Sequence, residues 1–298
     1  MPTRDWTSDA VLEMTDRAEL QRALSETIRT SGEWAFDIPL PHGLRTRTDP
    51  AYPHTRLRRV LQIIHDTVSR PLSECRVLDL GCLDGLYSLE LALHGARVLG
   101  IEAREANYRR ALFVKDAYDL PNLEFLRDDV RNLSRARHGT FDIVLCSGIL
   151  YHLPAPDVFQ FLENVFDVAE REVIIDTHIA LDPTDSFTYD SRTYHGLFHT
   201  EHEPTDEAAV IEARTLDSMD RRPSFFFTRP SLMNFLGKLG FSSTYECFGP
   251  PHLNYGMPGL EHRNRCTLLA LKGVACRVYT SPSAQGLDEF WPEGSLKY

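Results

Sequence analysis

The sequence predicts an α/β fold in which helices cover both faces of a doubly wound, mostly parallel sheet. The first observation is that short apolar runs alternate with segments of helical periodicity from Arg76 onward, which is typical of a parallel sheet. The second is that one apolar run ends in a glycine-containing turn that leads directly into a helical segment. At 298 residues, of which 42% are hydrophobic, the chain is long enough to bury such a core.

Seven strands are expected, each a short apolar run next to turn residues: Arg76–Leu80, Arg97–Ile101, Leu123–Arg127, Phe141–Cys146, Glu172–Thr177, Phe241–Phe248 and Arg265–Lys272. The helices expected between them are Gly85–His94, Glu105–Tyr118, Asp157–Val168 and Arg229–Leu239. This order of elements predicts a Rossmann-like, seven-stranded sheet, with a core over residues 71–273.

Two regions interrupt or flank this core. Residues 1–70 are expected to form an N-terminal helical extension, with helices over residues 7–30 and Thr55–Val68 separated by a loop rich in proline and aromatic residues. Residues 182–228 leave the alternating pattern, and a structureless loop of that length is unusual in a compact domain. We therefore expect an inserted cap there, on the carboxyl edge of the sheet, and a C-terminal tail over residues 274–298.

Composition narrows the function classes. The formal net charge is −11, whereas nucleic-acid binders need a basic surface to neutralise phosphates, so a nucleic-acid substrate is disfavoured. The six cysteines form no Cys-x-x-Cys pair, which indicates reduced, structural thiols. The first residues lack the pattern of a signal peptide, and no apolar run approaches the ~18–20 residues of a membrane span. We expect a cytoplasmic protein without a membrane partner, and a homodimer is left open.

The residues with the clearest chemical meaning follow the first three strands of the core. Asp79 lies at the end of the first strand and is followed by the turn with Gly81 and Gly85, where the backbone can approach a ligand closely at a helix N-terminus. Glu102 ends the second strand, where a carboxylate can accept hydrogen bonds from two ribose hydroxyls, and Asp129 follows the third. Each acid alone could be a solvated loop residue, but three at successive strand ends predict a nucleotide site.

The run Asp79-Leu80-Gly81-Cys82-Leu83-Asp84-Gly85 resembles motif I of class I S-adenosylmethionine-dependent methyltransferases, and residues 141–148 resemble motif IV. The resemblance covers about residues 71–273. It implies S-adenosyl-L-methionine as the cofactor, with Glu102 on the ribose and Asp129 on the adenine. The full set of cofactor-binding residues it implies is Asp79, Gly81, Cys82, Gly85, Tyr87, Glu102, Ala103, Asp129, Val130, Ser147 and Tyr151.

A narrower resemblance lies in Gly148-Ile149-Leu150-Tyr151-His152 and in residues 227–232. Both are similar to the methyltransferase branch that includes the bacterial tRNA wobble-uridine carboxymethyltransferase. The likeness implies that Tyr151 and Arg265 contact the cofactor or its carboxylate. We take it as a relationship of fold, because one fold hosts many activities.

The sulfonium cofactor brings its own leaving group, so a base is needed only where the acceptor is protonated. His152 and His178 follow the fourth and fifth strands and are the catalytic candidates, although either could instead close a loop by hydrogen bonding. The expected acceptor-binding residues are Trp34, Arg45, His195, His199 and Arg265. For Trp34 the alternative is core packing and for Arg45 a solvated loop. His195, His199 and His202 have ligand-like spacing, but without supporting cysteine or carboxylate geometry we expect no metal.

The sequence therefore predicts methyl transfer to an oxygen or nitrogen of a small-molecule acceptor. A tRNA-modifying alkyltransferase is the second hypothesis. A binding module that kept the cofactor fold and lost transfer is the third.

Overall fold

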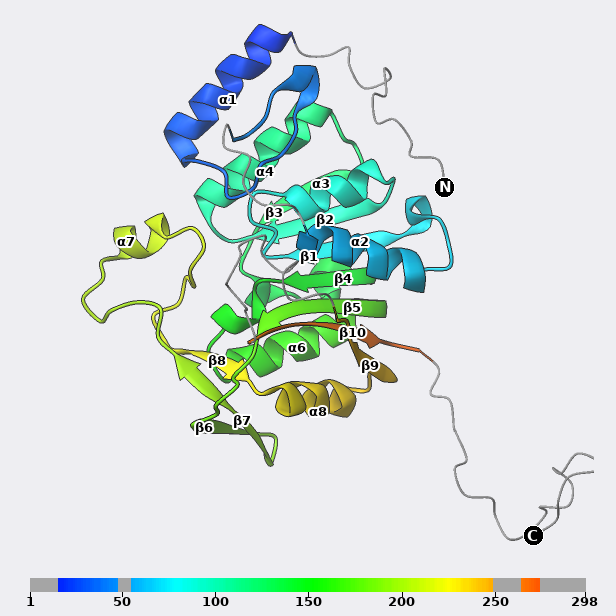
Figure 1. The fold of residues 1–298 in the computed structure, drawn as a ribbon, viewed down its shortest axis with the longest axis vertical. Helices are drawn as coiled ribbons and strands as arrows, with labels where there is room; N and C mark the ends of the chain where they lie inside the picture. The colour runs from blue at the N-terminus through cyan, green and yellow to red at the C-terminus, as the bar shows by residue number, and fades with distance from the viewer. Residues whose placement is uncertain (1–15, 48–54, 249–263, 274–298) are drawn as a thin grey trace, which may run out of the picture.

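A seven-stranded sheet forms the core of the computed structural model, which describes residues 16–47, 55–248 and 264–273 (Figure 1). Its strands in spatial order are β3 (Leu123–Arg127), β2 (Arg97–Glu102), β1 (Arg76–Leu80), β4 (Phe141–Ser147), β5 (Ala169–His178), β10 (Arg265–Leu271) and β9 (Ser243–Glu246). β1 to β5 pair in parallel, whereas β10 runs antiparallel to both β5 and β9. The predicted doubly wound, mostly parallel sheet is confirmed.

The order of the strands places a crevice beside β1. The chain builds β1, β2 and β3 in one direction and then returns to add β4 on the other side of β1. In such sheets the connections leave β1 and β4 toward opposite faces, and ligands bind beyond the carboxyl ends of the strands at this point. The fold therefore predicts where a ligand site should lie.

Helices cover both faces of the sheet. The cluster on one face includes residues of α2 (Thr55–Thr67), α3 (Leu86–Leu93) and α4 (Glu105–Tyr118), together with Val77 of β1. The cluster on the other includes residues of α6 (Asp157–Val168) and α8 (Arg229–Leu239), together with Leu78. Neighbouring residues of one strand thus enter opposite clusters, which is why these strands are apolar runs rather than alternating patterns. Short elements complete the core: α5 (Arg135–His138) and the 3₁₀ turns η2 (Leu72–Glu74), η3 (Val130–Asn132) and η4 (Leu150–His152).

The N-terminal segment packs against the same side of the molecule as α4. α1 (Arg17–Ser31) lies beside α4 in Figure 1, and the buried Arg110 of α4 donates to the carbonyl oxygen of Ser31 at 2.6 Å. Further along, the N–H groups of Ala35 and Phe36 donate to Asp84 in the turn after β1, at 2.6 and 3.2 Å. A single 3₁₀ turn, η1 (Pro41–Gly43), interrupts the loop that follows. The part of the expected first helix before residue 16 lies outside the described residues.

The insert, residues 182–228, forms a second sheet and one short helix. β6 (Asp185–Tyr189), β7 (Arg192–His199) and β8 (Ser224–Phe227) pair antiparallel, and α7 (Ala208–Ala213) lies between β7 and β8 in the chain. Phe225 and Phe227 are buried and pack near Phe159 of α6, at ring distances of 6.0 and 4.9 Å. Phe226 points to the other side, as the period of two in a strand requires. Figure 1 shows this insert on the side of the sheet at which β4 and β5 end.

Some boundaries differ from the prediction. β5 begins at Ala169 rather than at Glu172, because α6 leads into it without a turn. β9 covers only residues 243–246, since Phe241 instead packs edge-on against Phe166 at 5.0 Å. Within the described ranges the five cysteines are free thiols, and none of the helices there is long and apolar enough to cross a membrane. Cys276 lies outside these ranges.

Candidate active site

A cavity of about 500 Å³ lies at the carboxyl edge of the sheet, where the topology places a ligand site. Asp79, Glu102, Asp129 and Ser147, at or just beyond the ends of β1 to β4, line it. Other walls come from residues 35–37 and 55–57 of the N-terminal segment and from residues 215–220 of the insert, which we call the 215–220 loop. The core, the N-terminal segment and the insert therefore all contribute to one site.

The turn after β1 places backbone where a side chain would not fit. Gly81 has φ +65° and lines the cavity, and a Cβ on it would lie 3.2 Å from the side chain of Ile149. Gly85 has φ +86°, and a Cβ there would lie 2.8 Å from the ring of Phe125. Gly85 was expected to bind the cofactor, but it does not line the cavity. It precedes α3 and lets that helix pack closely against β3, so it supports the turn from behind.

Glu102 presents a carboxylate held by the backbone. Its Oε1 accepts the N–H of Arg104 at 2.8 Å and its Oε2 accepts that of Leu83 at 3.0 Å, and the residue is only 7% exposed. Burial raises the pKa of Glu102, and these hydrogen bonds oppose part of the rise. Each oxygen keeps a second lone pair. Such a pair of fixed acceptors suits two neighbouring hydroxyls, as on a ribose.

Asp79 and Asp129, the other two acids, also line the cavity, and each is engaged by a neighbour. Asp79 accepts the hydroxyl of Ser88 at 2.6 Å, and burial raises its pKa to about 6. Asp129 accepts the backbone N–H of Arg131 at 2.9 Å and forms an ion pair with the guanidinium at 2.6 Å. The Asp129 carboxylate has roughly four lone-pair sites. It can therefore accept an adenine amino group in addition to the hydrogen bonds from Arg131.

These residues fit an adenosine-containing cofactor. The glycine turn leaves space at the wall, and fixed carboxylates stand at successive strand ends. The remaining residues expected to bind the cofactor line the same cavity: Cys82, Tyr87, Ala103, Val130, Ser147 and Tyr151. Among the described residues no group of three or more histidines, cysteines or acids could hold a metal ion.

Both catalytic candidates line the cavity on the side of β4 and β5. The ring of Tyr151 lies between them, 4.2 Å from the ring of His152 and 4.6 Å from that of His178. Arg265 lies 5.5 Å over the ring of Tyr151, and its Nη1 donates to Nε2 of His178 at 3.0 Å. Because a guanidinium only donates, Nε2 of His178 is already used as an acceptor.

His152 is held differently, by an acid of the insert. Its Nδ1 lies 2.9 Å from Oε1 of Glu201, and both side chains are largely buried. Among the described residues none forms a hydrogen bond with Nε2 of His152. This nitrogen is therefore available at the cavity wall, unlike Nε2 of His178.

A buried acid organises the arginines at the far end of the cavity. Asp176 of β5 accepts hydrogen bonds from Arg265 at 2.5 Å and from Thr267 at 2.7 Å, and Arg56 of α2 lies 3.5 Å away. Burial favours a raised pKa for Asp176, but the charges of Arg265 and Arg56 outweigh it, so its pKa is lowered. Arg265 is thereby fixed with its guanidinium at the cavity.

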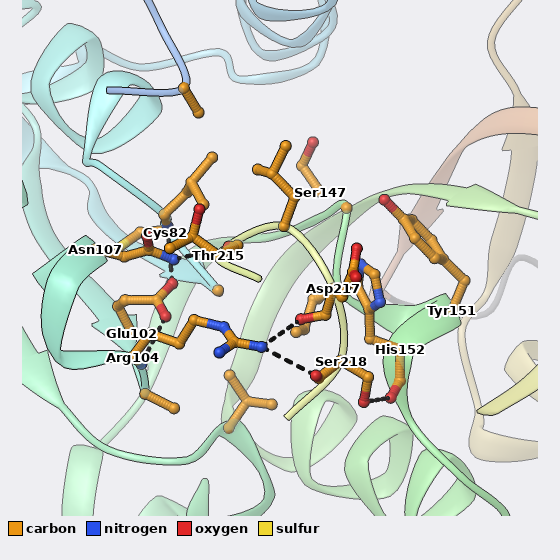
Figure 2. Close-up of a pocket in the computed structure, with 18 of the residues that line it drawn as sticks. Cys82, Glu102, Arg104, Asn107, Ser147, Tyr151, His152, Thr215, Asp217 and Ser218 are labelled. Carbon is orange, nitrogen blue, oxygen red and sulfur yellow. Dashed lines mark hydrogen bonds between the residues drawn. The ribbon is translucent and has the colours of Figure 1, made fainter. Parts of the chain in front are cut away.

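Arg104 joins the cofactor side of the cavity to the insert. It is 2% exposed and donates to four carbonyl oxygens of the insert at 2.7–3.0 Å: those of Ile211, Glu212, Asp217 and Ser218. Nearby, Asn107 donates to the carbonyl of Thr215 at 3.1 Å. Figure 2 shows Arg104 reaching from beside Glu102 toward Asp217 and Ser218, with Tyr151 and His152 beyond them.

Two residues of the N-terminal segment were expected at the acceptor and lie elsewhere. Trp34 is completely buried and packs edge-on against Phe113 at 5.4 Å, because its large apolar ring fills the core under α4. The half-exposed Arg45 forms an ion pair with Asp37 at 2.5 Å and does not line the cavity. Phe36 and Asp37 of the same segment line it instead.

The two insert histidines expected at the acceptor also lie outside the cavity. In the alternation of β7, Tyr194 takes the buried side and His195 the exposed one, and His195 borders a separate hollow. His199 ends β7 with its ring 5.0 Å from that of Phe226. Of the five expected acceptor residues, the structure brings only Arg265 into the cavity.

Sequence reasoning missed Arg56, Arg104, Glu201 and Ser218. Arg104 carried a usable signal, because it stands two residues after the strand-end acid Glu102. Glu201 and Ser218 carried none, since an acid and a serine in a polar insert look like solvated loop residues.

Comparisons with known proteins agree with this geometry. Residues 77–172 match the family described as Methyltransferase domain. The ubiquinone biosynthesis O-methyltransferase of Acinetobacter baylyi is 35% identical over 81 residues, which are 27% of this chain and 34% of that protein. The chain thus matches about a third of the length of that relative. The tRNA U34 carboxymethyltransferase of Helicobacter pylori is 24% identical over 201 residues, covering 62% of this chain and 77% of that protein.

A solved structure extends the likeness beyond the matched domain. The N-terminal domain of EvdMO1, determined in the presence of SAH and D-fucose, has the same fold with a TM-score of 0.64. It is 24% identical, and the match covers 87% of this chain and 97% of that one. With the glycine turn, the acids at successive strand ends and the matched family on one sheet, residues 77–172 are a class I S-adenosylmethionine-dependent methyltransferase domain.

Proposed function

We propose that the protein transfers a methyl group from S-adenosyl-L-methionine to a hydroxyl oxygen of a small-molecule acceptor. The observation that carries the proposal is His152, which lines the cavity together with Glu102 and keeps Nε2 without a partner among the described residues. A hydroxyl is protonated at neutral pH and gains from such a base, whereas an unprotonated amine does not need one. We infer oxygen rather than nitrogen for that reason.

The chain's own residues would divide the work. Bound S-adenosyl-L-methionine supplies a methyl group on a sulfonium and a neutral thioether as the leaving group. Glu102, Asp129 and the glycine turn would hold the adenosine part at the ends of β1 to β3. His152 would take the proton of the acceptor hydroxyl at Nε2 as the new carbon–oxygen bond forms. The walls from the N-terminal segment and the insert would align the acceptor and exclude water.

Charge and size support a small acceptor. The net charge is −11, and the insert that borders the acceptor side holds ten acidic and four basic residues. Such a field repels a polyanion. A cavity of about 500 Å³ is in the range of small-molecule sites. The EvdMO1 domain was determined in the presence of D-fucose, and a sugar, with its several hydroxyls, belongs to the proposed class of acceptors.

One observation favours a second candidate, the modification of tRNA. The tRNA U34 carboxymethyltransferase matches far more of this chain than the ubiquinone biosynthesis O-methyltransferase of Acinetobacter baylyi does, 62% against 27%. Tyr151 and Arg265, the two residues singled out by likeness to that branch, both line the cavity. An RNA enzyme should bind bulk tRNA with an affinity that falls steeply as salt rises.

The test is turnover. The full chain would be incubated with S-adenosyl-L-methionine and a panel of hydroxylated, amino and carboxylate-bearing small molecules. Mass spectrometry would then detect S-adenosylhomocysteine and the methylated product. Hydroxylated acceptors should give both, and His152→Ala should give neither at a comparable rate. Product formed only on amines, or only on tRNA, would reject the proposal.

A further inference from the structure

The contact between Glu201 and His152 restricts where the imidazole carries its proton. Nδ1 of His152 lies 2.9 Å from Oε1 and 3.0 Å from Oε2 of Glu201. The side chains are 13% and 10% exposed, so little water competes for the contact. Burial alone favours a raised pKa for Glu201, but the hydrogen bonds that it accepts from His152 and from the backbone of Ser218, together with its attraction to a protonated His152, lower the pKa. An ionised carboxylate only accepts, so in the neutral imidazole the proton lies on Nδ1 and the lone pair on Nε2.

Ser218 of the 215–220 loop fixes the carboxylate in turn. Its backbone N–H donates to Oε2 of Glu201 at 2.9 Å, and its hydroxyl donates to the carbonyl oxygen of His152 at 2.8 Å. Its own carbonyl oxygen accepts from Arg104 at 2.9 Å and from His202 at 2.6 Å. Ser218 is 4% exposed, so these partners are not readily exchanged for water. Because the backbone N–H of Ser218 can only donate, the atom of residue 201 at the Oε2 position must be a hydrogen-bond acceptor.

We propose that Glu201 is the positioning residue that holds His152 in its Nδ1-protonated form, with Ser218 fixing the orientation of the Glu201 carboxylate. The inference rests on the proposed function, in which Nε2 of His152 is the base. It adds that the base is competent only while the 215–220 loop lies against the cavity, because Ser218 belongs to that loop. Arg104 links the cofactor side of the cavity to the base, because it donates to the carbonyl oxygen of Ser218.

The Glu201→Gln variant tests this orientation. Its amide oxygen is expected to face the N–H of Ser218, which leaves the amide NH₂ facing Nδ1 of His152. Since that NH₂ only donates, the 2.9 Å contact with Nδ1 remains a hydrogen bond only if Nδ1 becomes the acceptor and the proton moves to Nε2. The variant keeps the size of the side chain and reverses the tautomer.

The direct measurement is a ¹⁵N NMR spectrum of the imidazole nitrogens in the full chain labelled with ¹⁵N-histidine. The signals of His152 are assigned as those that disappear in the His152→Asn variant. The wild type should carry the proton on Nδ1, and Glu201→Gln should carry it on Nε2. A wild-type proton on Nε2, or an unchanged tautomer in Glu201→Gln, would overturn the proposal. Were Glu201→Gln not to fold, the wild-type spectrum alone would decide.

Kinetics supply the second readout. Glu201→Gln should lower kcat by about 10²–10⁴, the usual worth of a general base, with the acceptor KM and the affinity for S-adenosylhomocysteine nearly unchanged. Glu201→Asp, which keeps the carboxylate, should recover part of the rate. Glu203→Gln, the same change at an exposed position two residues away, should behave as wild type. If no hydroxyl acceptor is turned over, the proposed function fails, while the spectra still decide whether Glu201 orients His152.

Discussion

The half of the cavity beside β1, β2 and β3 differs from the half beside β4, β5 and the insert in how its groups are held. In the first half the groups are backbone turns and acids at strand ends, within residues 79–131. In the second half they are side chains from distant segments. Examples are Glu201 on His152, 49 residues apart, and Arg265 on Asp176, 89 residues apart.

The two halves are therefore encoded in the sequence in different ways. Strand register alone places the acids of the first half, because parallel pairing aligns the carboxyl ends of neighbouring strands. The second half depends on loop contacts made by the insert and the N-terminal segment. We infer that a shared core binds the cofactor, while its additions determine the acceptor.

The largest effect is expected on the acceptor side. His152→Ala should lower kcat by about 10²–10⁴ through loss of the proton acceptor, while the affinity for S-adenosylhomocysteine stays near that of wild type. Steady-state kinetics and calorimetry would measure the two. The control is His195→Ala, a histidine of the insert that lies outside the cavity. Normal turnover in His152→Ala would show that the half of the cavity beside β4, β5 and the insert does not supply the base.

The converse result is expected on the cofactor side. Glu102→Ala removes a carboxylate placed for two hydroxyls, and hydrogen bonds to a charged group are worth about 1.5–3 kcal/mol. Affinity for S-adenosylhomocysteine should therefore fall roughly 10- to 150-fold by calorimetry. Glu124→Ala, at an exposed position of β3, serves as the control. Unchanged affinity would remove the basis for assigning the first half to the cofactor.

The same division explains what the sequence could predict. The ranges of β1, β3, α4, α6 and α8 match the expected ones residue for residue, because periodicity and flanking turn residues are local signals. Glu102 and Asp129 were placed at the site by the same means, since they end or follow such strands, and both line the cavity. Trp34 and His199 were misplaced, because local sequence does not say whether an aromatic or a loop histidine faces a core, a cavity or solvent. The contact of Glu201 with His152 could not be predicted without knowing the path of the whole insert.

A third variant tests the link between the halves. Arg104→Met keeps a long apolar stem but loses the donors to four insert carbonyls. Those carbonyls can bind water instead, so the net loss in local stability should be about 1–2 kcal/mol. Amide exchange in residues 208–220 should then speed up about 5- to 30-fold, as read by mass spectrometry. Arg109→Met, at an exposed arginine of α4, the helix that Arg104 precedes, is the control. Equal exchange in both variants would mean that Arg104 does not hold the insert.

The smallest effect concerns Asp220, which pairs with Arg131 at 2.8 Å and with Arg222 at 2.7 Å and so joins the insert to the residue that holds Asp129. Burial favours a raised pKa for Asp220, but the hydrogen bonds and charges of Arg222 and Arg131 lower it from 3.8 to about 2. A lowered pKa means that the ionised form favours the folded state. Its contribution is complete above about pH 4 and is lost as the pH falls toward 2.

The Asp220→Asn variant lacks this contribution of the ionised carboxylate at every pH. Urea unfolding should therefore show a deficit for Asp220→Asn of at most about 1 kcal/mol at pH 7, the usual worth of a partly exposed ion pair, and a smaller deficit at pH 3. Asp182→Asn, at an exposed position of the insert, should show no such convergence. A deficit that stays constant between pH 7 and 3 would mean that packing, and not the ion pairs, joins the 215–220 loop to the cofactor side.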